Sequence, residues 1–461
     1  MKLRILPVLV AGFMSATFLL SSCLGNDTSE IEYPATSSIT SFSIGTLHQT
    51  FYGKSSKGED SIYVDTISYA DCAFTIDQIN RRIYNKDSLP KDVDITRVVT
   101  SIEADIAAIY YEKNGKDTVW TSTDSLDFTN DIIFKVMAFS EIQNNFVYGQ
   151  GYRVSINVHK LNPDSLVWKH FDSSTFGEGI KLTEQKAVYQ NNNIYVFGKT
   201  SAEETKVFRT GVDRGNISGW EDITPAIQGI NIYSALAFEN DIYYVANGQL
   251  YNLSSNSPIG ALNNLVNLIS ATGDVMLAYT SDSKVCSIKA DGSKEKDIDF
   301  IDGEDMSGRL YAVSQTASHN PSLWRTTVMK NGAETDTTAC IYSYTSSDDT
   351  WVKYQPNYPT TCPNQKNISM IKYDGKLFAF GGLFDTFRSS VDNGLNWNEE
   401  TGYMVFPTEE KNGIKPLSSY RQDGTYSTVV EDNGSKGSFM WFIWQDGTMT
   451  RGHLNRLMPK E

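Results

Sequence analysis

Short runs of alternating apolar and polar residues occupy the chain from residue 37 almost to its end. The runs are rich in Val, Ile, Tyr, Phe and Thr, and clusters of Gly, Asn and Asp separate them. A period of two residues places every second side chain on the same face of a strand, and β-branched and aromatic residues suit a pleated surface. The pattern therefore predicts an all-β protein.

Residues 37–162 form the first part of this pattern. Short strands separated by Gly- and Asn-containing turns are typical of antiparallel sandwiches. The expected strands are 39–44, 61–67, 72–76, 107–111, 132–138 and 152–158. We therefore predict one or two β-sandwich modules, which resemble the immunoglobulin-like spacer modules of surface lipoproteins.

Residues 163–461 contain a loose repeat, in which an apolar strand follows a short turn six times. These strands are 193–198, 241–246, 274–279, 309–313, 376–382 and 438–443. Units of three or four strands that pack radially cover both faces of each sheet, so the repeat predicts a β-propeller of roughly six blades. A ring must close, and residues 165–171 are expected to join the blade that 449–454 completes. Two further sandwiches are the alternative.

One segment of the repeat matches the Asp-box pattern S/T-x-D-x-G-x-x-W, whose specified positions are Ser390, Asp392, Gly394 and Trp397. The Asp side chain is expected to accept backbone N–H bonds across a hairpin, Gly to adopt a positive φ, and Trp to wedge between neighbouring sheets. Residues 210–220 look like a degenerate copy. In propellers of the sialidase and sortilin type this box is architectural, so it predicts fold and not chemistry.

Residues 1–22 have the organisation of an export signal. Lys2 and Arg4 give a positive start, and an apolar stretch too short for a stable membrane span ends in Leu-Ser-Ser-Cys. This ending resembles the bacterial lipobox, so Cys23 is the predicted lipidation site and the predicted contact with the membrane. Residues 23–36 contain the lipidated cysteine and a polar tether. We expect an outer-membrane lipoprotein on the periplasmic face or the cell surface, with the surface favoured.

Three features of the sequence together resemble a family of uncharacterised lipoproteins from gut Bacteroidetes. They are the segment 152–168, the repeated apolar strands that end in Phe-Gly, and the C-terminal segment 451–457. Members of that family pair an N-terminal β module with a C-terminal kelch- or sialidase-like propeller. The resemblance implies architecture and location, and it carries no established activity.

Composition narrows the range of partners. The chain has 461 residues and a formal net charge of −15, which makes nucleic acid a poor partner because phosphate binding needs a basic face. Its five histidines are scattered without zinc-ligand spacing, so no metal or other cofactor is expected. Cys340 and Cys362 are close enough in sequence to form a disulfide, although buried free thiols are favoured.

Non-catalytic recognition of a carbohydrate or of an envelope protein is the function that this architecture favours. Exposed aromatic side chains on propeller loops could stack on sugar rings, and the competing interpretation places blade aromatics in the core. The candidates are Trp324, Tyr354, Tyr358, Trp441 and Trp444.

The alternative function is a sialidase-like glycoside hydrolase or lyase. Tyr420, Arg421 and Glu431 could form a nucleophile set, but this grouping rests on composition alone. Retaining glycosidases need two carboxylates about 5 Å apart, which a sequence cannot show. We therefore predict no catalytic residue.

Overall fold

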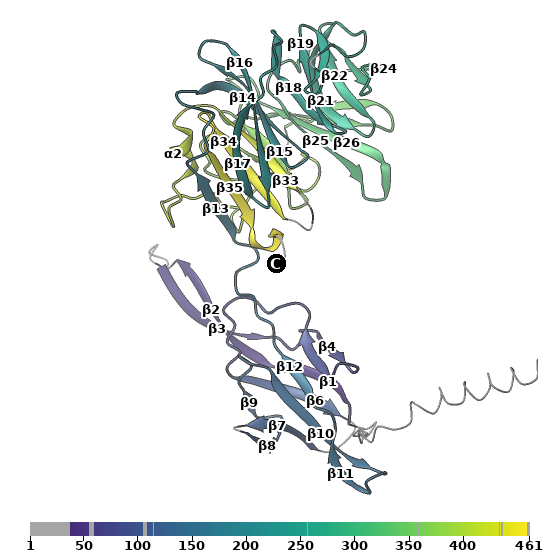
Figure 1. The fold of residues 1–461 in the computed structure, drawn as a ribbon, viewed down its shortest axis with the longest axis vertical. Coiled ribbons are helices and arrows are strands. Elements are labelled where there is room, and N and C mark those ends of the chain that lie inside the picture. Colours follow the sequence, from purple (N-terminus) through teal and green to yellow (C-terminus); the bar gives the residue numbers. More distant parts are fainter. Residues whose placement is uncertain are drawn as a thin grey trace, which may run out of the picture. The chain divides into compact units, whose positions relative to one another are not determined.

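The computed structural model describes residues 37–54, 60–104, 108–113, 115–255, 257–356, 359–432, 434 and 437–458. The chain divides into two compact units, Met1–Asn162 and Pro163–Glu461 (Figure 1). The predicted signal peptide, Cys23 and the tether lie outside the described residues. Within those ranges, no helix has the length and apolar character needed to cross a bilayer.

The N-terminal unit contains two sheets and a separate strand pair. The first sheet has the order β1 (Ile39–Ile44), β6 (Val98–Ala104) and β9 (Ser125–Leu126). The second has the order β4 (Phe74–Asp77), β5 (Arg82–Asn85), β12 (Tyr152–Ser155), β10 (Ile132–Ser140), β7 (Ala108–Lys113) and β8 (Lys116–Val119), with β11 (Asn145–Tyr148) also paired to β10. The separate pair consists of β2 (Thr46–Lys54) and β3 (Asp60–Ser68).

Strand alternation builds a single core between these two sheets. In β10, Phe134, Val136 and Ala138 are fully buried. Of the residues that alternate with them, Ile133 is exposed and Lys135 is half-buried. The same core receives Ile39 of the first sheet. The unit is thus a β-sandwich, and its likeness to immunoglobulin-like modules stays a prediction.

In the described part of the C-terminal unit, six antiparallel sheets form the blades of a propeller (Figure 1). The first three are β14 (Leu182–Gln190), β15 (Asn193–Thr200), β16 (Thr205–Asp213) and β17 (Asn216–Asp222); β18 (Ile230–Phe238), β19 (Asp241–Ala246) and β20 (Gln249–Asn252); and β21 (Leu265–Thr272), β22 (Val275–Thr280), β23 (Val285–Ile288) and β24 (Lys294–Ile298). The next two are β25 (Tyr311–Ala317), β26 (Asn320–Lys330), β27 (Cys340–Thr345) and β28 (Thr350–Lys353); and β29 (Ser369–Tyr373), β30 (Lys376–Phe380), β31 (Arg388–Ser390) and β32 (Asn398–Glu399). The last is β33 (Tyr426–Asp432), β34 (Ser438–Trp444), β35 (Met449–Leu454) and β13 (Leu166–Phe171), and the short helix α2 (Leu417–Arg421) precedes it.

The first strands of the blades form a closed inner ring. Each contacts the next in the order β14, β18, β21, β25, β29 and β33, and β33 contacts β14 again. The two ends of the unit meet in the last blade, where β13 pairs with β35 from Leu166 opposite Leu454 to Phe171 opposite Met449. This is the closure that the sequence predicts for residues 165–171.

The apolar strand of the repeat occupies the second position in five blades, as β15, β19, β22, β30 and β34. In the remaining blade, residues 309–313 instead run into the inner strand β25. The second strand of that blade is β26, which starts with Asn320 and contains several polar residues. An inner strand and a second strand show the same apolar alternation, and only strand pairing distinguishes them.

Candidate functional site

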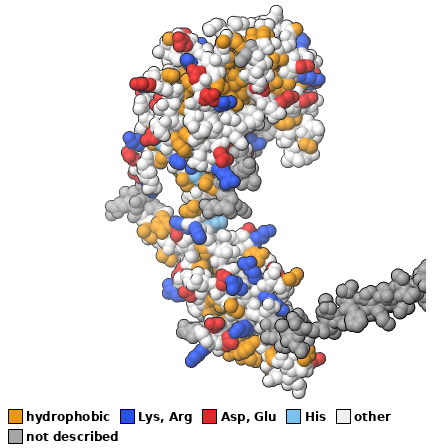
Figure 2. Space-filling model, in the orientation of Figure 1, with side chains coloured by type: hydrophobic (Ala, Val, Ile, Leu, Met, Phe, Trp, Pro, Cys, Tyr) orange, Lys and Arg blue, Asp and Glu red, His pale blue; other side chains and the backbone are white. Residues whose placement is uncertain are grey.

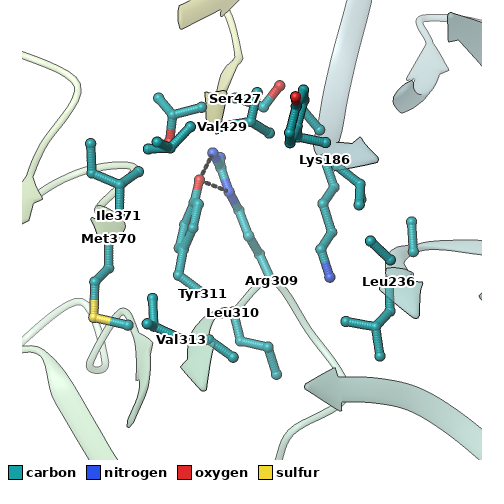
Figure 3. Close-up of a pocket in the computed structure, with 18 of the residues that line it drawn as sticks. Lys186, Leu236, Arg309, Leu310, Tyr311, Val313, Met370, Ile371, Ser427 and Val429 are labelled. Carbon is teal, nitrogen blue, oxygen red and sulfur yellow. Dashed lines mark hydrogen bonds between the residues drawn. The ribbon is translucent and has the colours of Figure 1, made fainter. Parts of the chain in front are cut away.

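The inner strands of all six blades line a cavity of about 330 Å³ on the propeller axis (Figure 3). The lining includes residues 185–189 of β14, 235–237 of β18, Ile269 of β21, 309–313 at β25, 370–372 of β29 and 427–430 of β33. Because every blade contributes, the cavity is complete only when the ring is closed.

Lys186 extends from β14 into this cavity (Figure 3). Its Nζ donates a hydrogen bond of 2.6 Å to the backbone carbonyl of Tyr233. Removal of the amine from bulk water lowers the pKa of Lys186 to about 7. Strand alternation directs the neighbouring Gln185 elsewhere, where its Nε2 donates to the carbonyl of Ile443 in the last blade. The amine is thus held inside the ring with a single hydrogen bond to the protein.

Arg309 lies just before β25 and reaches into the same cavity (Figure 3). Its Nε donates to the Tyr311 hydroxyl at 3.1 Å, and its Nη2 donates to that hydroxyl and, at 2.8 Å, to the carbonyl of Tyr426. Ser369 Oγ lies 3.0 Å from the hydroxyl groups of both tyrosines. These contacts hold the guanidinium through Nε and Nη2, and among the described residues Nη1 has no hydrogen-bond partner.

The rest of the lining is mostly apolar and includes two buried hydroxyl residues, Ser427 and Thr428. The apolar residues include Leu236, Ile269, Leu310, Val313, Met370, Ile371, Val429 and Val430. Thr428 of β33 also lines the cavity and is 7% exposed, and its Oγ1 has no hydrogen-bond partner among the described residues. Apolar walls with a few polar groups are typical of small-molecule sites.

The charged residues that line the cavity are Lys186, Arg309 and Lys372, all of them cations. The protein as a whole carries a net charge of −15. On the face shown in Figure 2, acidic and basic side chains are interspersed over the surface of the C-terminal unit. The cavity is therefore a local concentration of positive charge in an acidic protein.

A second, polar cavity of about 970 Å³ lies beside the first two blades. Tyr233 lines the second cavity, and its carbonyl accepts the hydrogen bond from Lys186 of the first. Burial raises the pKa of the Tyr233 hydroxyl to about 12, and Glu184, also in this lining, contributes to the shift. The second cavity has carboxylates as well as lysines in its lining, so its charge is mixed.

The Asp-box residues form a hydrogen-bonded hairpin. Asp392 accepts bonds from the Asn396 backbone N–H at 2.9 Å and from the Ser390 hydroxyl at 2.8 Å. Gly394 has a φ of 88°. The indole N–H of Trp397 donates to the Gly394 carbonyl at 2.9 Å, and the ring is buried with Met329 and Ile341 of the preceding blade. The box therefore lies between two blades, and none of its specified residues lines the axial cavity.

Burial corrects part of the predicted set of stacking residues. Trp441 and Trp444 are 0% exposed, and their indole N–H groups donate to Glu431 and Thr450. A ring enclosed in this way cannot stack on a sugar, and the sequence did not show it because a strand buried on both faces has no polar alternation.

The other predicted stacking residues lie in different places. Trp324 in β26 and Tyr354 after β28 are half-buried. Tyr354 packs against the core that contains Trp397. Tyr358 lies outside the described residues. None of the described aromatic candidates lines the axial cavity.

The suggested nucleophile set is also wrong. Glu431 is 0% exposed and its carboxylate accepts the Trp441 indole N–H at 2.9 Å. Tyr420 stacks on His170 with ring centroids 3.9 Å apart. Arg421 Nε donates to the carbonyl of Gly424 at 3.1 Å. A carboxylate enclosed in a blade has no access to a substrate.

Four cysteines within the described residues, Cys72, Cys286, Cys340 and Cys362, are free thiols. Burial raises the pKa of Cys286 to about 11 and that of Cys362 to about 12. Free thiols with raised pKa values are poor nucleophiles. Among the described residues, no group of three or more His, Cys, Asp or Glu side chains could hold a metal ion.

Sequence reasoning missed both cavity cations. Lys186 interrupts the strand Leu182–Gln190, and Arg309 precedes the apolar strand Tyr311–Ala317. A lysine in an alternating strand is ordinarily solvent-exposed, so nothing local marks it. Arg309 is the first residue of one segment of the repeat, 309–313, whereas Lys186 lies in none of the six.

The fold and cavity define the protein as a β-sandwich followed by a six-bladed β-propeller with an axial pocket. The family models agree with this division: residues 42–156 match the N-terminal domain of the domain of unknown function DUF6242, and residues 162–461 match the DUF6242 beta propeller domain. The chain belongs to the DUF6242 family.

Solved structures similar to this chain share little sequence with it. The N-terminal domain of Nup159 is 10% identical, with a TM-score of 0.34 over 58% of this chain and 74% of that chain. YCF48 from Cyanidioschyzon merolae is 12% identical, with a TM-score of 0.33 over 62% and 98% of the two chains. BamB from Moraxella catarrhalis is 7% identical, with a TM-score of 0.31 over 62% and 98%. No curated protein matches the chain.

Proposed function

We propose that this protein is a recognition protein, in which the propeller binds a ligand without chemically changing it. The observation that carries the proposal is the axial cavity, which combines apolar walls with hydrogen-bond donors supplied by several blades. Such a lining suits the binding of a small molecule or of a narrow end group of a larger one. The charged residues of the lining are Lys186, Arg309 and Lys372, which are donors and not the carboxylate pair of a glycosidase.

We further propose that the protein acts at the bacterial envelope as a lipoprotein anchored by Cys23. The support is the lipobox-like segment that ends at Cys23. An acyl anchor would hold the propeller close to the membrane, where a carbohydrate or an envelope protein is the available partner.

The function is tested with the full chain, purified in detergent, by binding and turnover measurements in parallel. Binding is measured against a panel of neutral and acidic polysaccharides and their monosaccharides, and turnover is followed by product analysis on the same panel. We expect binding of at least one panel member and no product. Product formation, or no binding to any member, would contradict recognition of a carbohydrate.

A further inference from the structure

The axial cavity holds more hydrogen-bond donors than it satisfies. Lys186 Nζ uses one N–H for the Tyr233 carbonyl, and Arg309 uses Nε and Nη2 for Tyr311 and Tyr426. Two N–H groups of Lys186 and those of Arg309 Nη1 have no partner among the described residues. Charged donors form stronger hydrogen bonds with an ionised acceptor than with a neutral one, so these groups favour a negatively charged acceptor.

The charge of the cavity supports the same conclusion. Neither Lys186 nor Arg309 forms an ion pair within the described part of the chain, although acidic residues outnumber basic ones by 55 to 40. Burial alone accounts for the lowered pKa of Lys186, with no carboxylate compensating for it. Buried charges in proteins are ordinarily paired. An anion from outside the chain would provide the missing partner.

Shape and polarity limit the kind of anion. The cavity of about 330 Å³ is at the small end of ligand pockets, and much of its wall is aliphatic. Thr428 also belongs to the lining, but its hydroxyl oxygen is buried, so the open donors are those of Lys186 and Arg309. An oxyanion on a small organic molecule fits this arrangement: its oxygens accept from the two cations and its remaining part packs on the walls.

We propose that the axial cavity binds a small organic anion through a carboxylate or phosphoryl group held between Lys186 and Arg309. The inference rests on the proposed recognition function and names the ligand class for that site. Glucuronate, glucose 6-phosphate and glucose form a matched set of probes, because they share one ring and differ in the charged group. Acetate and inorganic phosphate serve as the bare oxyanions.

The experiment measures thermal stability and calorimetric affinity for these probes at constant ionic strength. We compare the wild type with Lys186→Met, which keeps the length of the side chain and removes the charge. Lys169→Met, at an exposed lysine of β13 outside the cavity, is the matched control. The control also corrects for the general stabilisation that phosphate gives to many proteins.

We expect at least one acidic probe to raise the melting temperature of the wild type and of Lys169→Met, and glucose to have no effect. Lys186→Met should weaken the affinity by at least about tenfold, because one charge-assisted hydrogen bond is lost. Without a probe, Lys186→Met should melt at the same or a higher temperature than the wild type, since an unpaired buried charge is removed.

If Lys186→Met fails to fold, Lys186→Gln provides the same test, because it removes the charge and keeps a donor for the Tyr233 carbonyl. It should fold, and the affinity for the acidic probe should fall. Equal binding of acidic probes by wild type and variants, or no binding of any acidic probe, would overturn the inference. Recognition as such would survive that result if the polysaccharide panel still bound, so the two failures are distinguishable.

Discussion

Several ionisable side chains are enclosed in the last blade, next to its junction with the first. His453, Arg451 and Glu431 are 4%, 8% and 0% exposed. Arg451 Nη1 donates to the carbonyl of Gly215, and Glu431 accepts the Trp441 indole N–H. Burial raises the pKa of Glu431, whereas burial together with the Arg451 charge lowers the pKa of His453 to about 4. Each of these residues makes the stability of the fold depend on pH.

His453 should destabilise the folded protein as the pH falls from 6.5 toward 4. In that window the unfolded chain binds a proton at His453 and the folded chain does not, so the free energy of unfolding decreases by roughly 2 kcal/mol between pH 7 and 4.5. Urea denaturation at both pH values measures the decrease. His453→Gln should lose that much less stability on acidification. Glu431 contributes to the pH dependence of stability with the opposite sign, because its pKa is raised in the folded state, but it is present in both the wild type and the variant. An unchanged pH dependence in His453→Gln would contradict the lowered pKa of His453.

Individual hairpins connect neighbouring blades. In the Asp-box, Thr327 of β26 donates its hydroxyl hydrogen to the carbonyl of Asn393 at 2.9 Å. A Cβ added at Gly394 would lie 2.9 Å from Thr327 Cγ2, so the hairpin approaches the adjacent blade too closely for a larger residue. The element therefore orients one blade against the next.

Asp392→Ala should lower the free energy of unfolding by about 1–2 kcal/mol, because the partly buried Asn396 backbone N–H loses its acceptor. Chemical denaturation monitored by tryptophan fluorescence measures the change. Asp302→Ala, at an exposed aspartate of the same unit, should change stability by less than about 0.5 kcal/mol. Affinity for a ligand of the axial cavity should be unaffected in both variants. A loss of binding in Asp392→Ala alone would show that the Asp-box takes part in recognition.

At the scale of the whole molecule, the propeller depends on contacts between the two ends of its sequence. The strand Leu166–Phe171 completes the blade whose other strands end at Leu454. Trp168 packs against Phe442 of that blade with ring centroids 5.6 Å apart, and a Cβ at Gly452 would lie 2.8 Å from the Trp168 ring. Closure both buries the last blade and completes the axial cavity.

The membrane anchor is also a property of the whole molecule. We predict that a fatty-acid analogue supplied to growing cells labels the wild type and does not label Cys23→Ser, and that the variant leaves the membrane fraction. Cys72→Ser, which replaces another cysteine, should keep the label. Label retained in Cys23→Ser would contradict lipidation at this residue.

The hydrophobic pattern predicted most of the fold. Five of the six apolar strands of the repeat are second strands of blades, and the closing pair is as expected, because period-two alternation and turn residues are local properties. The pattern was misleading at residues 309–313, where an inner strand has the same alternation. It also left open whether Trp441 and Trp444 are exposed on loops or lie in the core, and both are fully buried.

The sequence by itself determined the β class, the approximate number of blades and the Asp-box, since each follows from residues that are near one another along the chain. Only the tertiary structure showed the candidate site. Lys186 and Arg309 are more than a hundred positions apart and belong to different blades, and they face one cavity because the ring closes. Ring closure depends on all the blades together, so no local pattern could indicate which charged residues it would enclose.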